Sequence, residues 1–269
     1  MKHYNLIRTT LITIFLSCGL FIPTIASAEA PLKLYTLLFK PYGYLDEETK
    51  KVTGISQELF TMMQERMGLN NRVEVLPLPP KRMVPVLKDE QNILLFPLVY
   101  NKKREAFLDW VFHFNDATFD FAMLKGNEFD ENFAKRNLKG VTEGKIGVVR
   151  GTIFEATLLK FGLDKKRLSF ANSAQQNLKK LINKRVDYIF SSRSVIEGIF
   201  NTKEFASAKD LVVISDPIML AKVHMVRSKN FDPELLEKIN KALQSLVDDG
   251  SVQKLLDKYS LVKPTPIKY

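Results

Sequence analysis

Short apolar runs alternate with amphipathic segments along most of the chain, and this order limits the possible folds more than any other feature. The apolar runs are typical of buried strands, and they occupy residues 32–38, 73–78, 93–99, 119–124, 145–149, 185–190, 211–214 and 223–226. The segments between them predict helices at 54–68, 81–88, from 152 onward, and at 173–183, 232–249 and 251–259. We expect Gly68 to end the first of these helices, Asp232 to cap the helix at 232–249, and Ser251 to cap the last one. Strands that alternate with helices predict an α/β fold containing parallel strands.

The sequence also indicates two lobes. Two polar stretches, 125–144 and 216–222, separate segments of similar make-up and are the candidate crossings between lobes. The chain has 269 residues, which is enough for one large or two small domains. We expect lobe 1 to contain residues 29–118 and 221–269, and lobe 2 to be the inserted segment 119–220.

The first 28 residues have the composition of a secretory signal peptide. Lys2 and Arg8 form a basic start, an apolar run covers 11–25, and the small residues 26–28 suit cleavage after Ala28. Two alternatives stay open. An uncleaved membrane anchor is one, although the run is short for a spanning helix. Lipid attachment at Cys18 is the other, although residues 15–17 are a poor signal for it.

Cys18 is the only cysteine, so a chain cleaved after Ala28 would have neither a disulfide nor a thiolate metal site. We therefore expect a periplasmic protein that is held together by its apolar core. The formal net charge is +10, but the basic residues are spread along the chain without a long run. This distribution does not favour nucleic acid as a partner, and it is compatible with attraction of an acidic ligand.

Arg104 is the main candidate for ligand binding. It lies in the segment NKKREAFLDW, directly after the apolar run 93–99. A guanidinium at a strand end can face a cleft, and its planar fork matches a carboxylate with two parallel hydrogen bonds. The alternative is that Arg104 pairs with Glu105 or Asp109 at the surface.

Gly151 and Thr152 form a second candidate anion site. They follow the expected strand 145–149, and Thr152 with Glu155 has the spacing of a capping box. Gly151 would let the backbone approach a ligand, and the free N–H groups of a helix start attract anions. The alternative is a capped helix that binds nothing.

Three further side chains are placed where they could reach a cleft. Tyr42, with Tyr44, lies in a turn after the first strand and is expected either to form a cleft wall or to cover a lobe edge. Arg82 lies at the start of the predicted helix 81–88. Ser192 closes the strand 185–190 and could donate a hydrogen bond into the cleft.

Three segments resemble the family 3 periplasmic solute-binding proteins, which are receptors of polar amino-acid ABC transporters. These segments are INKALQSLVDDGSVQKLLDKY at 239–259, KIGVVRGT at 145–152, and Lys103-Arg104 followed by Asp109-Trp110. The resemblance extends from residue 33 to 259. It implies the type II periplasmic binding protein fold, in which two mixed sheets flanked by helices form lobes that two crossings join and that close on a ligand.

By this resemblance, Arg104 would bind the ligand carboxylate, Gly151 and Thr152 would add hydrogen bonds from the other lobe, and Tyr42 matches an aromatic position. The chain departs from the family before Arg104, where Pro97 and Val99 replace the usual Gly and Thr or Ser. It also has Ser192 where typical members have an Asp for the α-amino group. The ammonium group of an α-amino acid would then have no charge partner. Another carboxylate or a small polar solute is therefore at least as plausible a ligand as an α-amino acid.

We therefore expect a monomeric periplasmic protein that captures a small amino-acid-like or carboxylate solute for an inner-membrane ABC permease, without catalytic residues, metal or cofactor. One alternative is an enzyme on the same fold, similar to cyclohexadienyl dehydratase. The sequence has neither the HExxH nor the GxSxG motif, and His113 and His224 are interpreted as packed residues. The other alternative is a ligand-sensing protein that acts on a membrane receptor.

Overall fold

The structure is a computed structural model that describes residues 31–69, 71–127 and 144–265. The predicted signal peptide at 1–28, Cys18 and most of the stretch 125–144 lie outside the described residues. The strands are β1 (Lys33–Thr36), β2 (Tyr44–Leu45), β3 (Val52–Thr53), β4 (Val75–Pro77), β5 (Ile93–Val99), β6 (Leu108–Leu124), β7 (Ile146–Val149), β8 (Leu168–Ala171), β9 (Tyr188–Ser192), β10 (Val212–Ile214) and β11 (Met219–Ser228).

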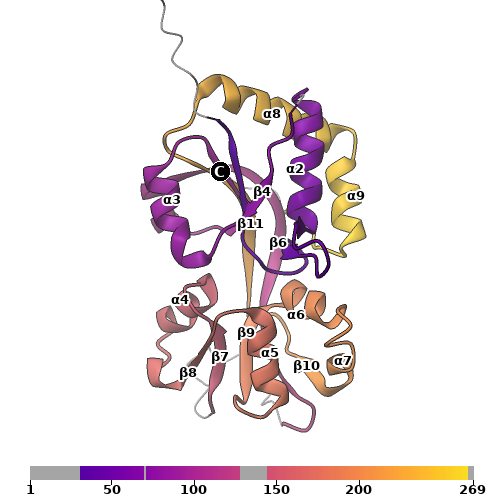
Figure 1. Ribbon diagram of the computed structural model, residues 1–269. Coiled ribbons are helices and arrows are strands. Elements are labelled where there is room, and N and C mark those ends of the chain that lie inside the picture. Colours follow the sequence, from indigo (N-terminus) through magenta and orange to yellow (C-terminus); the bar gives the residue numbers. More distant parts are fainter. Residues whose placement is uncertain (1–30, 70, 128–143, 266–269) are drawn as a thin grey trace, which may run out of the picture. The chain divides into compact units, whose positions relative to one another are not determined.

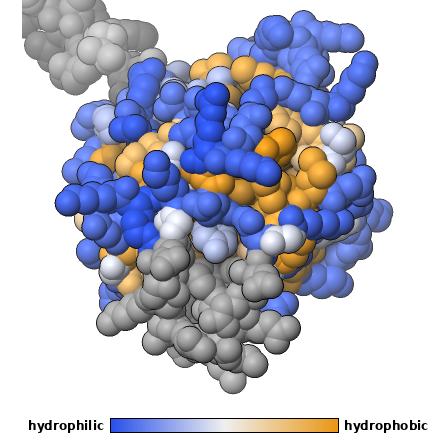
Figure 2. Space-filling view, turned by 90° about the horizontal axis from the view of Figure 1, so that it is seen from below, coloured by the Kyte–Doolittle hydropathy of each residue, from blue (hydrophilic) through white to orange (hydrophobic). Residues whose placement is uncertain are grey.

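The helices are α2 (Ile55–Arg66), α3 (Met83–Asp89), α4 (Ile153–Lys160), α5 (Ala174–Ile182), α6 (Arg193–Phe200), α7 (Ala208–Leu211), α8 (Pro233–Asp248) and α9 (Ser251–Lys258). Three short 3₁₀ helices are η1 (Pro80–Arg82), η2 (Lys102–Ala106) and η4 (Lys165–Arg167). Within the described residues no helix has the length and apolarity that a membrane span requires. Polar and charged side chains cover much of the end of lobe 2, with apolar side chains in patches between them (Figure 2).

The α/β fold is confirmed, and its strands form one mixed sheet. The order along the sheet is β4-β1-β5-β11-β6-β9-β7-β8, and β10 pairs with β6. Strands β4, β1 and β5 are parallel, as are β9, β7 and β8. The long strands β11 and β6 are antiparallel to their neighbours and run between the helices of lobe 1 and those of lobe 2 (Figure 1). The two expected mixed sheets are therefore joined by β6 and β11.

Strand β6 corrects the predicted position of the first crossing. The sequence predicted a strand at 119–124 and a crossing at 125–144, whereas β6 spans 17 residues from Leu108 to Leu124. Residues 119–122 already pair with β9, and the Lys125 N–H donates a 2.8 Å hydrogen bond to the carbonyl of Leu211 beyond the strand end. The crossing is β6 itself, because residues 108–124 contain no glycine or proline that would interrupt a strand.

The buried apolar residues form four clusters. Two of them combine residues of segment 32–117 with residues of segment 223–261. The other two lie mostly within 119–221, and Val99 and Phe39 of lobe 1 pack against them. Each group of elements thus has its own core, and a few lobe 1 side chains extend to the core of lobe 2.

Helix ends follow local sequence signals in most places. Gly68 follows the end of α2 with φ 66°, as predicted for a glycine in the left-handed conformation. Asp232 caps α8 as predicted, because its carboxylate accepts a 2.7 Å hydrogen bond from the N–H of Leu235. The predicted Ser251 cap of α9 is wrong. Gly250, at φ 76°, occupies the N-cap position, and Ser251 is the first helical residue.

Several elements were not predicted from the sequence, among them β2, β3, β8, α6 and α7. Helix α6 begins directly after β9, within the polar run 191–194, without a loop between the two elements. Its N-cap is Ser192, the last residue of β9, whose side-chain oxygen accepts a hydrogen bond from the N–H of Val195 at 3.4 Å. The prediction that Ser192 closes the strand is correct, and its hydroxyl also starts the next helix.

Candidate functional site

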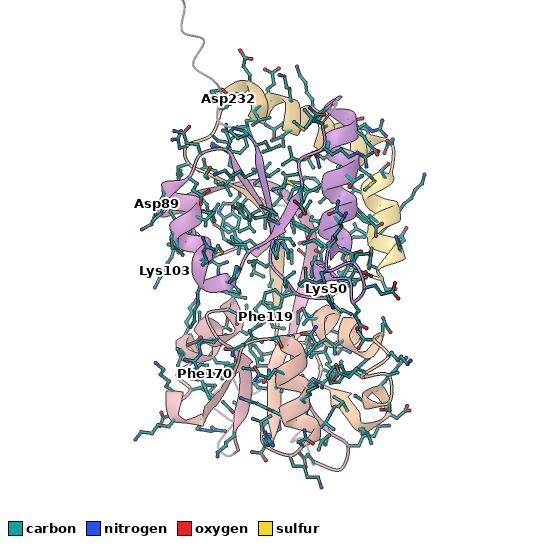
Figure 3. The ribbon with its side chains drawn as sticks, viewed as in Figure 1. Lys50, Asp89, Lys103, Phe119, Phe170 and Asp232 are labelled. Carbon is teal, nitrogen blue, oxygen red and sulfur yellow. The ribbon has the colours of Figure 1, made fainter. Side chains whose placement is uncertain are left out.

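A cavity of about 70 Å³ is lined by residues of both lobes. Lobe 1 contributes Leu37, Phe39, Tyr42, Pro80, Met83, Pro97, Leu98, Val99, Arg104, Ala117 and Val223. Lobe 2 contributes Phe119, Gly151, Thr152, Ile153, Phe154, Ser192 and Val195. The volume is enough for several water molecules or a small organic molecule. Phe119 lies where the two groups of elements meet (Figure 3).

Five of the six predicted ligand-binding residues line this cavity, namely Tyr42, Arg104, Gly151, Thr152 and Ser192. They come from four separate parts of the chain, and the fold brings them together. The apolar lining residues were not recognised as site residues, because an apolar side chain that lines a cavity and one that fills a core have the same sequence pattern.

Arg104 lies in η2, directly after β5, and is partly buried. Its Nη1 atom donates a 2.8 Å hydrogen bond to the carbonyl of Val99, the last residue of β5. This bond holds one edge of the guanidinium against the strand end. Burial lowers the pKa of Arg104 to about 10, so the side chain stays charged at neutral pH.

The alternative pairing of Arg104 with Glu105 or Asp109 is not found. The Glu105 carboxylate accepts a 2.9 Å hydrogen bond from the hydroxyl of Tyr100, and Asp109 forms ion pairs with Arg227 and Lys229. Among the described residues, no carboxylate lies within ion-pair distance of Arg104. The cavity therefore contains a cation that has no anionic protein partner.

The start of α4 faces Arg104's cavity from lobe 2, but its cap differs from the prediction. Thr152 is the N-cap residue, yet its hydroxyl donates to the carbonyl of Val149 at 2.6 Å and caps no helical N–H. The Glu155 carboxylate reaches back to the N–H of Gly151 at 2.7 Å. The predicted Thr152–Glu155 capping box is therefore wrong, because the Thr152 hydroxyl is bonded to the strand end and Glu155 accepts from the N–H of Gly151, one residue before the N-cap. The first-turn N–H groups of α4 have no partner within the helix.

Tyr42, for which the sequence predicted either a cleft wall or a cover of a lobe edge, is buried and lines the cavity. Its exposed fraction is 3%, it packs on Phe96, and its hydroxyl donates a 3.1 Å hydrogen bond to Asn115 Oδ1. Burial raises its pKa to about 12, so it stays neutral. The turn between β1 and β2 places the Tyr42 ring in the interior, where it is one of the groups that line the cavity.

Arg82 does not reach the cavity. It is exposed at the end of η1, whereas its neighbours Pro80 and Met83 line the cavity wall. A wider and more polar second cavity shares Phe39 and Pro80 with the first one and is lined by residues of both lobes. Arg82 lines neither of them.

Helix α6 of lobe 2 contacts lobe 1 directly. The position of a Cβ atom on Gly198 would lie 3.0 Å from the Lys40 carbonyl carbon and 3.1 Å from the Pro41 nitrogen. Gly198 thus allows the backbone of residues 40–41 to come against the helix, and the lobes are in contact next to the cavity.

Comparisons with known proteins give the family of this chain. The family described as bacterial extracellular solute-binding proteins, family 3, matches residues 35–262. The chain belongs to this family. The comparison with curated proteins gave no match.

Solved structures of similar fold come from binding proteins and a sensor. A histidine kinase sensor domain with similarity to periplasmic binding proteins has a TM-score of 0.72 at 17% identity, covering 86% of this chain and 98% of that one. An ancestral arginine-binding protein bound to arginine has a TM-score of 0.68 at 22% identity, covering 85% and 97%. An ancestral amino acid-binding protein, a precursor of cyclohexadienyl dehydratase, has a TM-score of 0.67 at 20% identity, covering 85% and 94%. At these identities the likeness establishes the two-lobed fold alone.

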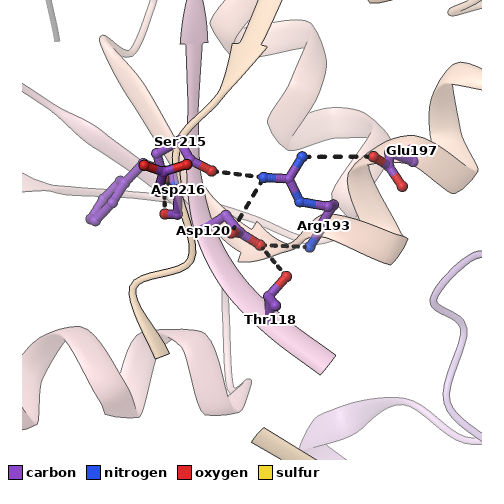
Figure 4. Close-up of polar contacts among 7 residues, drawn as sticks. Thr118, Asp120, Arg193, Glu197, Ser215 and Asp216 are labelled. Carbon is purple, nitrogen blue, oxygen red and sulfur yellow. Dashed lines mark hydrogen bonds and ion pairs between the residues drawn. The ribbon is translucent and has the colours of Figure 1, made fainter. Parts of the chain in front are cut away.

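In this family 3 protein, a buried acid lies beside the point where β6 enters lobe 2. Asp120 is fully buried, and its Oδ2 atom accepts hydrogen bonds from the Thr118 hydroxyl at 2.7 Å and the Arg193 N–H at 3.1 Å. The Arg193 side chain donates at 2.7 Å to the carbonyl of Ser215, shortly before β11 (Figure 4). Desolvation raises the pKa of Asp120. This network connects β6, α6 and the approach to β11, and a single Asp in an apolar run gave no sequence signal for it.

His113 and His224 of this family 3 protein are packed, as predicted. The rings of His113 and His224 stack with centroids 4.7 Å apart, and His113 contacts Asp116 at 2.8 Å. Burial lowers the pKa of His224 to about 4. Within the described part of the chain, no group of three or more His, Cys, Asp or Glu side chains could hold a metal ion.

Proposed function

We propose that this protein captures a small solute bearing a carboxylate between its two lobes in the periplasm and delivers it to an inner-membrane ABC permease. The observation that carries the proposal is the convergence of Arg104 from lobe 1 with Gly151 and Thr152 from lobe 2 on one cavity. Two different lobes thus contribute groups that favour a negative charge. A ligand that touches both groups stabilises the state in which the lobes are together.

The division of roles follows from the geometry. One edge of the Arg104 guanidinium is hydrogen-bonded to Val99, which leaves its other donors for a ligand carboxylate. The start of α4 offers N–H groups and the positive end of the helix dipole. The lobes would rotate about β6 and β11 near residues 118–119 and 220–221, because these strands are the covalent crossings of the described chain.

Export is part of the proposal. The basic and apolar segment 1–28 would direct the chain across the inner membrane and be removed after Ala28. We propose that the released chain acts as a monomer without cofactor. A sensing role is distinguished by the partner, because a transporter receptor would bind its permease and a sensor would bind a membrane receptor.

Binding without chemistry is favoured by the groups that line the cavity. In the part of the lining that the structure describes, the two ionisable side chains are Arg104, with a pKa of about 10, and Tyr42, with a pKa of about 12. Neither is suited to donate or accept a proton near neutral pH. A dehydratase would need such a group at the reacting atoms.

Thermal shift measurements with organic acids, amino acids and polyamines test the proposal. A ligand at a hundredfold excess over its Kd adds about 2.7 kcal/mol, which raises the Tm by roughly 5–10 °C in a chain of this size. We expect Arg104→Ala to abolish the shift and to keep the fold. The matched control is Arg72→Ala, since Arg72 is exposed and paired with Glu65 away from the cavity.

Small-angle X-ray scattering checks the closing movement independently. The radius of gyration should fall when the stabilising solute is added to wild-type protein, and it should not change for Arg104→Ala. A wild-type scattering curve that is the same with and without every tight ligand would contradict the proposed mechanism.

A further inference from the structure

The lining of the cavity restricts the chemistry of the ligand beyond the presence of a carboxylate. Most lining side chains are apolar, including Leu37, Phe39, Met83 and Leu98 from lobe 1 and Phe119 and Phe154 from lobe 2. Such a surface favours an apolar ligand body, because burying each CH₂ group contributes about as much as in a protein core.

Among the described residues that line the cavity, Arg104 is the only charged one. A bound carboxylate would neutralise it. A zwitterionic amino acid would bring an ammonium group in addition, and the described lining contains no Asp or Glu to compensate that charge. A buried charge without a partner strongly disfavours binding.

The carboxylates close to the cavity wall in sequence are already used by the protein. Glu155 accepts from the N–H of Gly151, and Asp120 accepts from Thr118 and Arg193. The backbone carbonyl of Val99, a cavity-lining acceptor, is bonded to Arg104 itself. The Asp120 Oδ1 atom has no hydrogen-bond partner, but it lies 3.8 Å from the Arg193 guanidinium, and neither Asp120 nor Glu155 is among the lining residues. An ammonium group in the cavity would therefore meet neither of these acids, and the Val99 carbonyl is already bonded.

The lining hydroxyls do not replace an acid. The Thr152 hydroxyl donates to the carbonyl of Val149, and the Ser192 oxygen accepts from the N–H of Val195. Each oxygen retains a lone pair for a weak neutral contact, which is a poor substitute for a carboxylate opposite an ammonium.

We propose that the ligand is a monocarboxylate with an apolar body and no ammonium group. This inference rests on the proposed function, since it concerns the same cavity. Arg104 binds the carboxylate, the apolar residues of both lobes enclose the body, and the absence of an acid at Ser192 excludes α-amino acids.

Matched pairs of compounds that differ only in the amino group test this ligand class. The pairs are 3-methylbutanoate and L-valine, 4-methylpentanoate and L-leucine, and 3-phenylpropionate and L-phenylalanine. Calorimetric titration of the wild-type protein should show at least tenfold tighter binding of the acid in the pair whose size fits. Equal or tighter binding of the amino acid would overturn the ligand class and leave the proposed solute-binding function intact.

A second variant makes the test independent of ligand size. Asp is as good an N-cap residue as Ser, so Ser192→Asp preserves the start of α6 while it places a carboxylate at the cavity wall. The variant should gain affinity for the amino acid of the best pair, relative to its acid, by at least tenfold. An unchanged ratio would contradict the missing acid as the reason for selectivity.

Failure of the ligand class and failure of the function are separable. If none of the six compounds binds but another solute raises the Tm and reduces the radius of gyration, the ligand class is wrong and solute binding holds. If no solute of any class raises the Tm or reduces the radius of gyration, both the ligand class and the proposed function are wrong.

Discussion

At the scale of single residues, the decisive feature is a partly buried cation, Arg104, that no described acid of the protein neutralises. Arg104 is held by a backbone carbonyl, and burial lowers its pKa to about 10 without reaching neutrality. The neighbouring acids Glu105 and Asp109, which could have paired with it, have other partners. A desolvated guanidinium of this kind gains more from a ligand carboxylate than an exposed one does, because water competes less.

A second residue-scale feature predicts how stability depends on pH. The pKa of His224 is lowered from 6.5 to about 4, chiefly by burial, so the folded state resists its protonation. Its contribution to stability is fully present above pH 6.5 and is lost as the pH falls toward 4, on the order of 3 kcal/mol in total. We expect His224→Phe to flatten this part of the profile.

Urea unfolding between pH 7.5 and 4 measures the effect, with the wild-type profile as reference. Phenylalanine keeps the ring contacts of His224 with His113 and Trp110, so the fold should persist. The difference between the two profiles isolates His224 from the other acids and histidines. Equal slopes in both proteins would contradict the assigned pKa.

At the scale of elements, helix α6 combines three roles. Ser192 starts it at the cavity wall, and Arg193 ties it to the approach of β11 through the carbonyl of Ser215. Gly198 presents bare backbone to residues 40–41 of lobe 1. The helix therefore contacts the ligand cavity, a crossing strand and the opposite lobe, so a change in its packing should alter closure as well as binding.

Gly198→Ala should separate closure from stability. Alanine in a helix interior stabilises by roughly 0.5–1 kcal/mol relative to glycine. The new Cβ would lie about 3.0 Å from the backbone of Lys40, however, and backbone atoms cannot move aside without moving the lobe. We expect an equal or higher Tm without ligand, together with weaker binding and a larger radius of gyration at saturation.

Gly162→Ala is a less informative control, because Gly162 has a positive φ of 85° and would be strained. A better comparison is Ala156→Ser on the exposed side of α4, which should leave both readouts unchanged. If scattering shows that Gly198→Ala closes like the wild-type protein, the contact between α6 and residues 40–41 is not needed for closure.

At the scale of the whole molecule, the mixed sheet is continuous through the two crossings. Strands β6 and β11 belong to both groups of elements, pair with each other along most of their length and join the cores of lobe 1 and lobe 2. Closure would then be a bend of one two-stranded connection. Such a bend is compatible with large lobe displacement and small local change.

The net charge makes a prediction at the same scale. The formal charge of the chain is +10, which raises the local concentration of anions around it. We expect the association rate of an anionic ligand to fall several-fold between 20 and 500 mM salt, because the Debye length shortens from about 20 Å to a few ångströms. Stopped-flow fluorescence measures this rate. The dissociation rate should change much less, since the bound carboxylate is shielded in the cavity, and the opposite pattern would contradict steering.

Much of the fold was predictable from local sequence patterns. The strand at 93–99, the glycine after α2 and the Asp232 cap of α8 are as predicted, because apolar periodicity and capping depend on residues close together in the chain. The position of Arg104 after a strand was predictable for the same reason. The apolar walls, the buried Tyr42 ring and the Asp120 network were not, since each depends on partners far away in sequence.

The sequence by itself determined an α/β chain with a guanidinium at the end of one strand and a helix start after another strand. These features depend on apolar runs and capping residues that lie close together in the chain. Only the tertiary structure decided that both groups line one cavity, that the acids beside Arg104 pair elsewhere, and that β6 passes unbroken between the lobes. These outcomes depend on contacts between segments that are distant in the sequence, because which apolar surfaces become buried and which charges pair is determined by the folded molecule as a whole.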